Sequence, residues 1–373
     1  MDGNRLTVPP ATDEVEISVF GPGYGESILL HIGKNVWFVV DSCIDPLSKK
    51  PAPLAYFQQI GIDPAHCVRQ VIASHWHDDH IRGLGKLFRA CSNAEFVCSS
   101  AIQSKEFLEI VRAYGTRAMM ESTGTDEFNI VLDALRERAA VSGLRYMPPR
   151  FARANLLLWQ NTDCTIHALS PSDASILAAQ LDLARLFPAE KEAKRRLLAT
   201  DPNKTAVVLW IRIGDFVILL GSDLDETTDD QRGWSVIINS SLRPSGKASL
   251  FKIPHHGSDN AHTSGVWSEL LLENPFAALT PYEKGDMKLP TRKDVERICS
   301  HTTNAYSTAV VGRKRIVKRD RTVEKTIRET VLDIKQLHTS IGHVRFRANV
   351  PNDWSVELFG DALPLKGLYS PSL

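Results

Sequence analysis

The sequence predicts an α/β fold, organised as one domain over residues 1–373 with helical insertions. Short β-rich runs alternate along the chain with longer stretches of helical periodicity. Three of these runs are followed directly by polar loops, which is where α/β folds place their chemistry. Hydrophobic residues make up 43% and charged residues 24% of the 373 positions, so the chain can bury a large core.

The pattern in the first part of the chain predicts a hairpin-rich sheet followed by one buried strand. Its β-rich runs are separated by turn residues and by a short helical patch at 53–60. From Ile81 onward apolar residues recur at helical spacing, so the polar residues before it lie between a strand and a helix. The strands expected here are 15–20, 27–32, 36–40 and 68–73.

The periodicity in the rest of the chain predicts helical insertions between further strands. Amphipathic helical patterns occupy about 101–145 and 171–200, and a basic segment with closing strands fills about 311–373. Residues 323–334 fit helix and strand periodicities equally. The strands expected here are 155–160, 165–169, 205–213, 216–220, 250–253, 344–348 and 354–358.

Composition and the amino-terminal segment limit the partners and the cellular compartment expected of the protein. Lysine plus arginine balance aspartate plus glutamate at 44 each, so no global field steers the molecule toward nucleic acid or membrane. The polar start at 1–16 lacks the pattern of a secretory signal, and no run reaches the roughly 18 to 20 apolar residues of a membrane span. We therefore expect a cytoplasmic protein without a membrane partner. Six cysteines without a CxxC pair favour reduced core thiols over a disulfide framework.

The densest polar cluster is the run HWHDDH at 75–80, which fits the pattern H-x-H-x-D-H. His75 and His77 alternate toward one side and Asp79 and His80 toward another, so two adjacent metal positions can be served. Imidazole and carboxylate are the ligands expected of zinc. A buried cluster without a metal would cost about 1–3 kcal/mol for each unsatisfied group, so the alternative is a cluster that lies in solvent.

Two later polar loops also follow strands. Residues 221–226 contain Asp223, and the run PHHGS at 254–258 contains His255 and His256. Because loops at strand ends can meet at one edge of a sandwich, we expect these side chains to approach the histidine cluster.

Together these motifs resemble the metallo-β-lactamase superfamily, and within it the soluble nuclease-like domain of the competence protein ComEC and its relatives. The resemblance runs in family order from about Val15 to Thr308 and so covers most of the chain. It implies the αββα sandwich of that superfamily, with helical insertions. The segments that carry it are GYGESIL at 23–29, VVDS at 39–42, HWHDDH at 75–80, NKT at 203–205, LGSDL at 220–224 and KIPHHGS at 252–258.

The resemblance also implies a ligand set. His75 and His77 would hold one metal ion, Asp79 and His80 the second, and Asp223 would bridge both. The second site would be completed by His255 or His256, which the sequence does not separate; we assign His256 as the ligand and His255 as the group that orients substrate or protonates the leaving group.

Supporting residues follow from the same resemblance. Asp79 would also steer or deprotonate the attacking water. Asp41 and Glu26 would orient the ligands from behind, with Glu26 standing where relatives often have Asp.

The sequence departs from the superfamily's pattern at one ligand position, which affects the number of metal ions expected. Two-zinc relatives have a third histidine between the cluster and the bridging aspartate, but no histidine occurs between Ile81 and Ile166. We interpret His167, the remaining candidate, as a core or edge histidine. The expected cofactor is therefore Zn²⁺ as one or two ions, with Mn²⁺ as an alternative.

The implied function is a metal-dependent hydrolase that cleaves phosphodiester bonds through a metal-activated hydroxide. The leading substrate is nucleic acid, because the resemblance is nuclease-like and Arg313, Lys314 and Arg315 could follow a phosphate backbone. A solvated edge strand is the alternative for that basic run. The alternative functions are a small-molecule phosphodiesterase or ester hydrolase, and a weakly active metal-binding subunit of a bacterial multi-gene system that binds a protein partner through the helical insertions.

Overall fold

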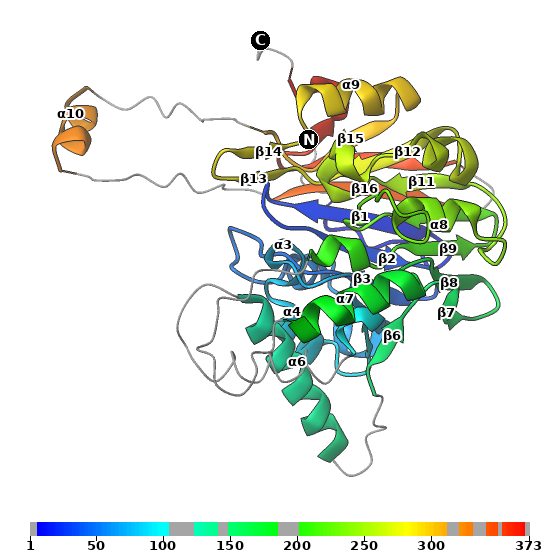
Figure 1. Ribbon diagram of the computed structural model, residues 1–373. Coiled ribbons are helices and arrows are strands. Elements are labelled where there is room, and N and C mark those ends of the chain that lie inside the picture. Colours follow the sequence, from blue (N-terminus) through cyan, green and yellow to red (C-terminus); the bar gives the residue numbers. More distant parts are fainter. Residues whose placement is uncertain are drawn as a thin grey trace.

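The structure is a computed structural model (Figure 1). It describes residues 6–103, 123–140, 148–185, 201–311, 321–330, 341–349 and 353–369.

Two eight-stranded sheets form the centre of the molecule (Figure 1). The first has the order β17-β16-β1-β2-β3-β4-β5-β6 and the second the order β18-β15-β12-β11-β10-β9-β8-β7. The strands of the first sheet are β1 Val15–Gly21, β2 Ser27–His31, β3 Trp37–Val40, β4 Val68–Ala73, β5 Glu95–Ser99, β6 Arg150–Ala152, β16 Gly342–Ala348 and β17 Ser355–Phe359. Those of the second are β7 Leu156–Gln160, β8 Cys164–Ala168, β9 Leu209–Ile213, β10 Phe216–Leu220, β11 Ala248–Lys252, β12 Leu271–Leu279, β15 Ala305–Ser307 and β18 Leu363–Pro364.

Helices cover the outer faces of both sheets. The helices are α1 Ala52–Gln59, α2 Pro64–Cys67, α3 Asp78–Ile81, α4 Leu84–Ala90, α6 Thr123–Ala140, α7 Asp173–Arg185, α8 Gly233–Asn239, α9 Arg292–His301 and α10 Arg321–Thr330. Apolar residues of α1, α4 and α6 pack on the first sheet, and those of α8 and α9 pack on the second. A separate hairpin of β13 Tyr282–Lys284 and β14 Met287–Leu289 stands at one side of the sandwich (Figure 1).

Side-chain alternation places the core on both faces of each sheet. In β3, Trp37 and Val39 pack toward the helices, while Phe38 and Val40 pack between the two sheets. The central cluster combines residues of both sheets, such as Ile72 from β4 and Ile218 from β10. The predicted αββα sandwich is thereby confirmed.

Parallel pairing positions the site. β3, β4 and β5 pair in parallel, as do β10, β11 and β12. The carboxyl ends of parallel strands meet at one edge of a sheet, so the loops that follow β4, β10 and β11 can face one another.

Most predicted elements lie where the sequence placed them. The expected strand 205–213 is partly wrong: β9 begins at Leu209, because residues Pro202–Thr205 form a 3₁₀ turn. Of the two insertions, α6 and α7 are helical as expected, whereas 104–122, 141–147 and 186–200 lie outside the described residues. Within the segment of undecided periodicity, α10 is a helix.

All six cysteines are free thiols; five are buried and Cys299 is partly exposed. Among the described helices, none combines the length and apolar character needed to cross a bilayer.

Candidate metal centre

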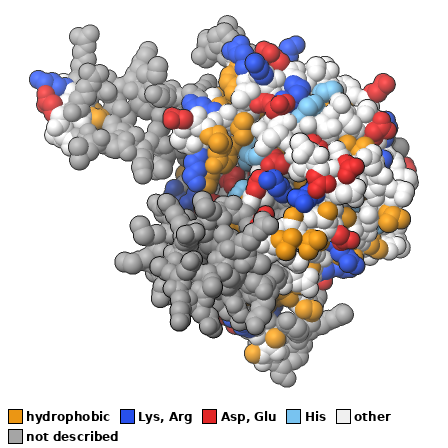
Figure 2. Space-filling model, in the orientation of Figure 1, with side chains coloured by type: hydrophobic (Ala, Val, Ile, Leu, Met, Phe, Trp, Pro, Cys, Tyr) orange, Lys and Arg blue, Asp and Glu red, His pale blue; other side chains and the backbone are white. Residues whose placement is uncertain are grey.

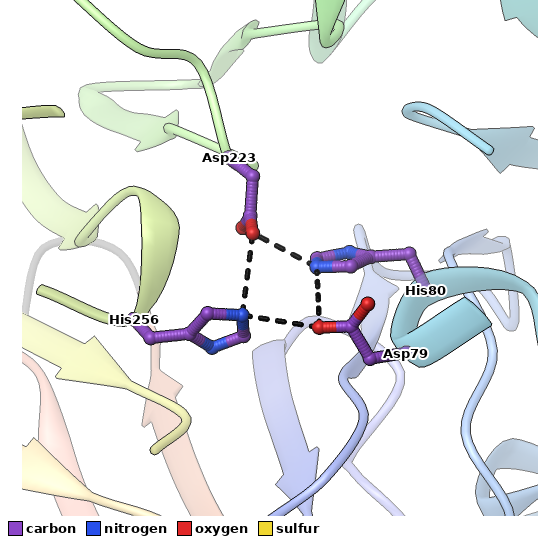
Figure 3. Close-up of side chains that lie close together, drawn as sticks. All are labelled: Asp79, His80, Asp223 and His256. Atoms are coloured by element: carbon purple, nitrogen blue, oxygen red, sulfur yellow. Dashed lines mark hydrogen bonds and ion pairs between the residues drawn. The ribbon is translucent and has the colours of Figure 1, made fainter. Parts of the chain in front are cut away.

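Three loops bring four of the predicted residues together (Figure 3). Asp79 and His80 lie on α3, which follows β4 after a short loop, whereas Asp223 follows β10 and His256 follows β11. Their candidate ligand atoms all lie within 4.8 Å of one another. All four residues are buried, with Asp79 the most exposed at 6%.

The cluster is compact around one point. His256 Nε2 lies 3.2 Å from both Asp79 Oδ2 and Asp223 Oδ2. His80 Nε2 lies 3.3 Å from Asp223 Oδ1 and 3.9 Å from Asp79 Oδ2. The sequence therefore predicted one group of side chains that the fold does bring together.

Hydrogen bonds on the far side of each ring set its orientation. His80 Nδ1 donates to Asp41 Oδ2 at 2.8 Å, and His256 Nδ1 donates to the Thr280 carbonyl oxygen at 2.8 Å. Asp41 is held in turn by Ser74, whose backbone N–H and hydroxyl donate to its carboxylate at 2.7 and 2.6 Å. Each imidazole thus presents Nε2 to the centre, as a metal-binding histidine does.

His75 and His77 lie beside this group. The His75 ring centroid is 4.2 Å from that of His80 and 5.0 Å from that of His77. A second possible metal group joins His75 and His80 to Asp41. Because Asp41 already accepts from Ser74 and His80, we interpret it as an orienting residue. Neither group includes His167, which is partly exposed on β8.

Buried polar atoms without partners test whether a cation fits. Among the described residues, His75 Nε2 is buried and has no hydrogen-bond partner. His80 Nε2 and Asp223 Oδ1 are also buried, and the 3.3 Å ion-pair contact between them does not meet hydrogen-bond geometry. Each such group costs about 1–3 kcal/mol, which coordination would recover. Imidazole nitrogens and carboxylate oxygens are donors that suit Zn²⁺. The residues present therefore fit a divalent cation.

Electrostatics at the centre favour positive charge. Burial alone would lower the pKa of His256, but Asp223 and Asp79 raise it to about 9. Burial likewise opposes the charged form of His80, yet Asp223 and Asp41 raise its pKa well above the usual value. Burial would raise the pKa of Asp223, which His80 and His256 hold well below its usual range. The carboxylates thus hold protons on the imidazoles, and a divalent ion would replace those protons.

A buried ion pair supports the group from behind. Lys252 and Glu26 are both fully buried, and Lys252 Nζ lies 2.6 Å from Glu26 Oε2 and 3.8 Å from Asp223 Oδ1. The Thr280 hydroxyl also donates to Glu26 Oε2, at 2.5 Å. Glu26 N–H donates to the Asp79 carbonyl oxygen at 2.8 Å, so the pair links the loop before β2 to all three site loops.

Close backbone packing fixes the loop before β2, which contains Gly25 and Glu26. Gly25 has φ +113°, and a Cβ there would lie 2.8 Å from Cys43 Cβ. Only glycine combines this conformation with so close an approach.

The histidine doublet divides into two roles. His256 joins the cluster, whereas His255 points to Asp225, whose Oδ1 lies 2.6 Å from His255 Nδ1. Asn203 Nδ2 lies 3.2 Å from His255 Nε2. Three residues of the site were not predicted from the sequence, although they lie in or beside the segments that carry the resemblance: Asp225, Asn203 and Lys252.

A cavity of about 520 Å³ opens above the cluster. Asp79, Asp223 and His256 form part of its floor, and Tyr24, Trp76 and Tyr282 are among its walls. Figure 2 shows hydrophobic, basic, acidic and histidine side chains gathered around a hollow beside the place of β13 and β14 in Figure 1. Arg313, Lys314 and Arg315 lie outside the described residues.

Comparisons with known proteins bear on the fold. Residues 20–115 match the family model of the metallo-beta-lactamase superfamily. The two sheets with their flanking helices match a metallo-β-lactamase fold. A search of curated proteins finds no match.

Solved structures resemble the chain at low identity. The metallo-beta-lactamase fold protein YhfI from Bacillus subtilis is 14% identical with a TM-score of 0.37, over 79% of this chain and 95% of that one. A mutant of the β-hydroxylase CmlA is 12% identical with a TM-score of 0.34, over 80% of this chain and 42% of that one. Zn²⁺-bound PqqB from Methylobacterium extorquens is 12% identical with a TM-score of 0.29, over 61% of this chain and 55% of that one.

Proposed function

We propose that this chain is a metal-dependent hydrolase that cleaves phosphodiester bonds. The observation that carries the proposal is the meeting of Asp79, His80, Asp223 and His256 around one point at the floor of a cavity. Two carboxylates and two imidazoles with Nε2 facing inward form a site for a divalent cation with room for a substrate. The superfamily match over residues 20–115 supports a hydrolase of this kind.

A divalent ion held by these residues would supply Lewis-acid polarisation of the substrate and activation of water. The chain's own groups do the rest. Asp79 lies both in the cluster and on the cavity floor, where its carboxylate can orient the attacking water or accept its proton.

His255 is placed to act on the leaving group. It lines the cavity without joining the cluster, and Asp225 holds its Nδ1 at 2.6 Å. A histidine supported by a carboxylate in this way can give a proton to a departing alkoxide. Asn203, within 3.2 Å of the other ring nitrogen, limits rotation of the ring.

Phosphodiesters are the proposed substrate class, with nucleic acid as the first candidate, because the sequence resembles a nuclease-like domain. The cavity favours a second candidate, a small phosphodiester. Its volume of about 520 Å³ is in the range of sites that enclose one small ligand.

A protein partner for the helical insertions remains a proposal of its own. Leu177 and Leu181 on α7 are 58% and 51% exposed. Because residues four apart lie on one face of a helix, they form an apolar surface that a partner helix could cover.

The test joins metal content to turnover. Purified protein would be assayed for bound metal and for hydrolysis of linear DNA, RNA and bis-p-nitrophenyl phosphate, beside Asp79→Ala and the exposed control Asp230→Ala. We expect the purified protein to contain metal and to cleave a nucleic acid. The cleavage rate should fall at least about a hundredfold in Asp79→Ala and stay unchanged in the control. Turnover of the small diester alone would favour the second candidate, metal without turnover a binding subunit, and absence of metal would refute the assignment.

A further inference from the structure

One wall of the cavity is made by the hairpin β13–β14 and the loop that contains Tyr24. Tyr282, Lys284, Met287 and Leu289 line the cavity from the hairpin. The hairpin is attached to the loop, because Glu283 N–H donates to the Gly23 carbonyl oxygen at 2.9 Å. Lys284 Nζ also lies 3.4 Å from the Tyr24 hydroxyl. This wall therefore has a defined position beside the cluster.

Aromatic rings lead from the metal centre outward along this wall. The ring centroids of His256 and Tyr282 are 5.2 Å apart at 40°, and those of Tyr282 and Tyr24 are 5.5 Å apart at 54°. Lys284 Nζ lies 5.3 Å from the Tyr24 ring centroid. Tyr24 and Tyr282 both line the cavity beside the cluster, so a planar group that enters it would contact aromatic side chains.

The part of the wall formed by β14 has apolar side chains that are exposed to solvent. Met287 is 60% exposed, and Leu289 is partly buried next to it on β14. Both side chains line the cavity, so they can contact an apolar part of a ligand bound there. Methionine adapts its shape to flat rings and makes favourable sulfur–aromatic contacts.

Charge on the wall is low. Of the described residues that line the cavity, Lys284 is the only lysine or arginine. Burial and the carboxylate of Asp79 raise the pKa of Tyr24 to about 12, so its phenol stays neutral at physiological pH. The phosphodiester would be held by the cation at the cluster, whereas this wall, with one lysine and neutral aromatic rings, suits a planar ring system.

We propose that Tyr24, Tyr282 and Met287 bind the base of a nucleotide whose phosphodiester lies at the metal centre. This inference rests on the proposed function and gives its substrate class a nucleoside part. The base can come from a nucleic-acid chain or from a small nucleotide, since both present the same planar face.

The experiment measures binding first, so that it does not depend on turnover. Calorimetry would compare adenosine 5′-monophosphate with ribose 5-phosphate on the metal-loaded protein. We expect the nucleotide to bind at least about tenfold more tightly, as stacking on one aromatic side chain commonly provides. Tyr282→Ala should remove this preference, Tyr282→Phe should keep it, and Met287→Ala should reduce it. The matched control is Leu242→Ala, an exposed leucine away from this wall at 77% exposure.

A kinetic arm separates the two sources of the base. Hydrolysis of a dinucleotide, its abasic analogue and long single-stranded DNA would be compared in the same variants. A higher kcat/KM for the long DNA would assign the base to a nucleic-acid chain, and a higher kcat/KM for the dinucleotide would assign it to a small nucleotide. We expect kcat/KM for the base-containing substrates to fall about ten- to a hundredfold in Tyr282→Ala, with the abasic analogue little changed. Equal binding of the two monophosphates, or a preference that survives Tyr282→Ala in folded protein, would overturn the inference. If the proposed function is wrong, none of the diesters will be hydrolysed. The comparison of adenosine 5′-monophosphate with ribose 5-phosphate would then still decide whether the wall binds a base.

Discussion

The buried pair Lys252–Glu26 allows a quantitative test of how the site is held together. Both side chains are fully buried with 2.6 Å between Nζ and Oε2, and Glu26 Oε1 has no described partner. Lys252→Met removes the ammonium but leaves the carboxylate in the interior with the Thr280 hydroxyl as its remaining partner. Breaking a buried pair from one side costs about 3–5 kcal/mol, a large part of the 5–15 kcal/mol that stabilises a typical domain.

The assay is urea unfolding of chelator-treated protein, because a bound metal ion would add its own stabilisation. We expect Lys252→Met to lower the free energy of unfolding by about 3–5 kcal/mol. The double variant Lys252→Met/Glu26→Gln removes both charges and should lie within about 2 kcal/mol of the parent. Glu26→Gln alone completes the cycle. If the effects of Lys252→Met and Glu26→Gln simply add in the double variant, or if Lys252→Met costs less than about 1 kcal/mol, the two charges do not stabilise the site as a pair.

Two further predictions concern metal affinity and pH. Asp41 has φ +60°, which asparagine also tolerates, so Asp41→Asn should keep the fold. It removes the charge and replaces one carboxylate oxygen by an NH2 donor, so that Ser74 N–H and His80 Nδ1–H compete for one neutral acceptor. Its metal affinity, measured by chelator competition, should fall about 10- to 100-fold, and a change under about threefold would exclude this orienting role. Burial lowers the pKa of His31 to about 4 from 6.5, so the folded state binds that proton less tightly than the unfolded state. Stability should therefore be full above pH 6.5 and fall by up to about 3 kcal/mol as the pH drops toward 4. Urea unfolding across this range should show a shallower slope in His31→Gln, and an unchanged slope would assign the pH dependence to other groups.

Elements with a clear local pattern were predicted, and those that depend on distant partners were not. β4 occupies Val68–Ala73 as expected, because an apolar run before a polar loop is a local signal. β12 was not predicted, since LLENPFAAL contains polar residues and a proline. It forms because it pairs in parallel with both β11 and β15, and such pairing overrides local propensity.

The candidate site divides in the same way. The spacing within HWHDDH indicated metal-ligand chemistry because four suitable donors lie within six residues. His255 and His256 are chemically identical neighbours, and nothing local distinguishes them. Their positive φ values, +44° and +54°, turn one ring toward Asp225 and the other toward the cluster.

By itself, the sequence determined the kinds of ligand, their order along the chain and the strands that precede them, because donor chemistry and short-range periodicity are local properties. Only the tertiary structure decided which donors meet, because Glu26 and Lys252, or Asp79 and His256, are joined by sheet packing rather than by spacing. The same packing created the cavity wall of Tyr24 and Tyr282, which are distant in the chain and yet 5.5 Å apart in space. Contacts of this kind depend on the summed burial of two sheets, which no single segment contains.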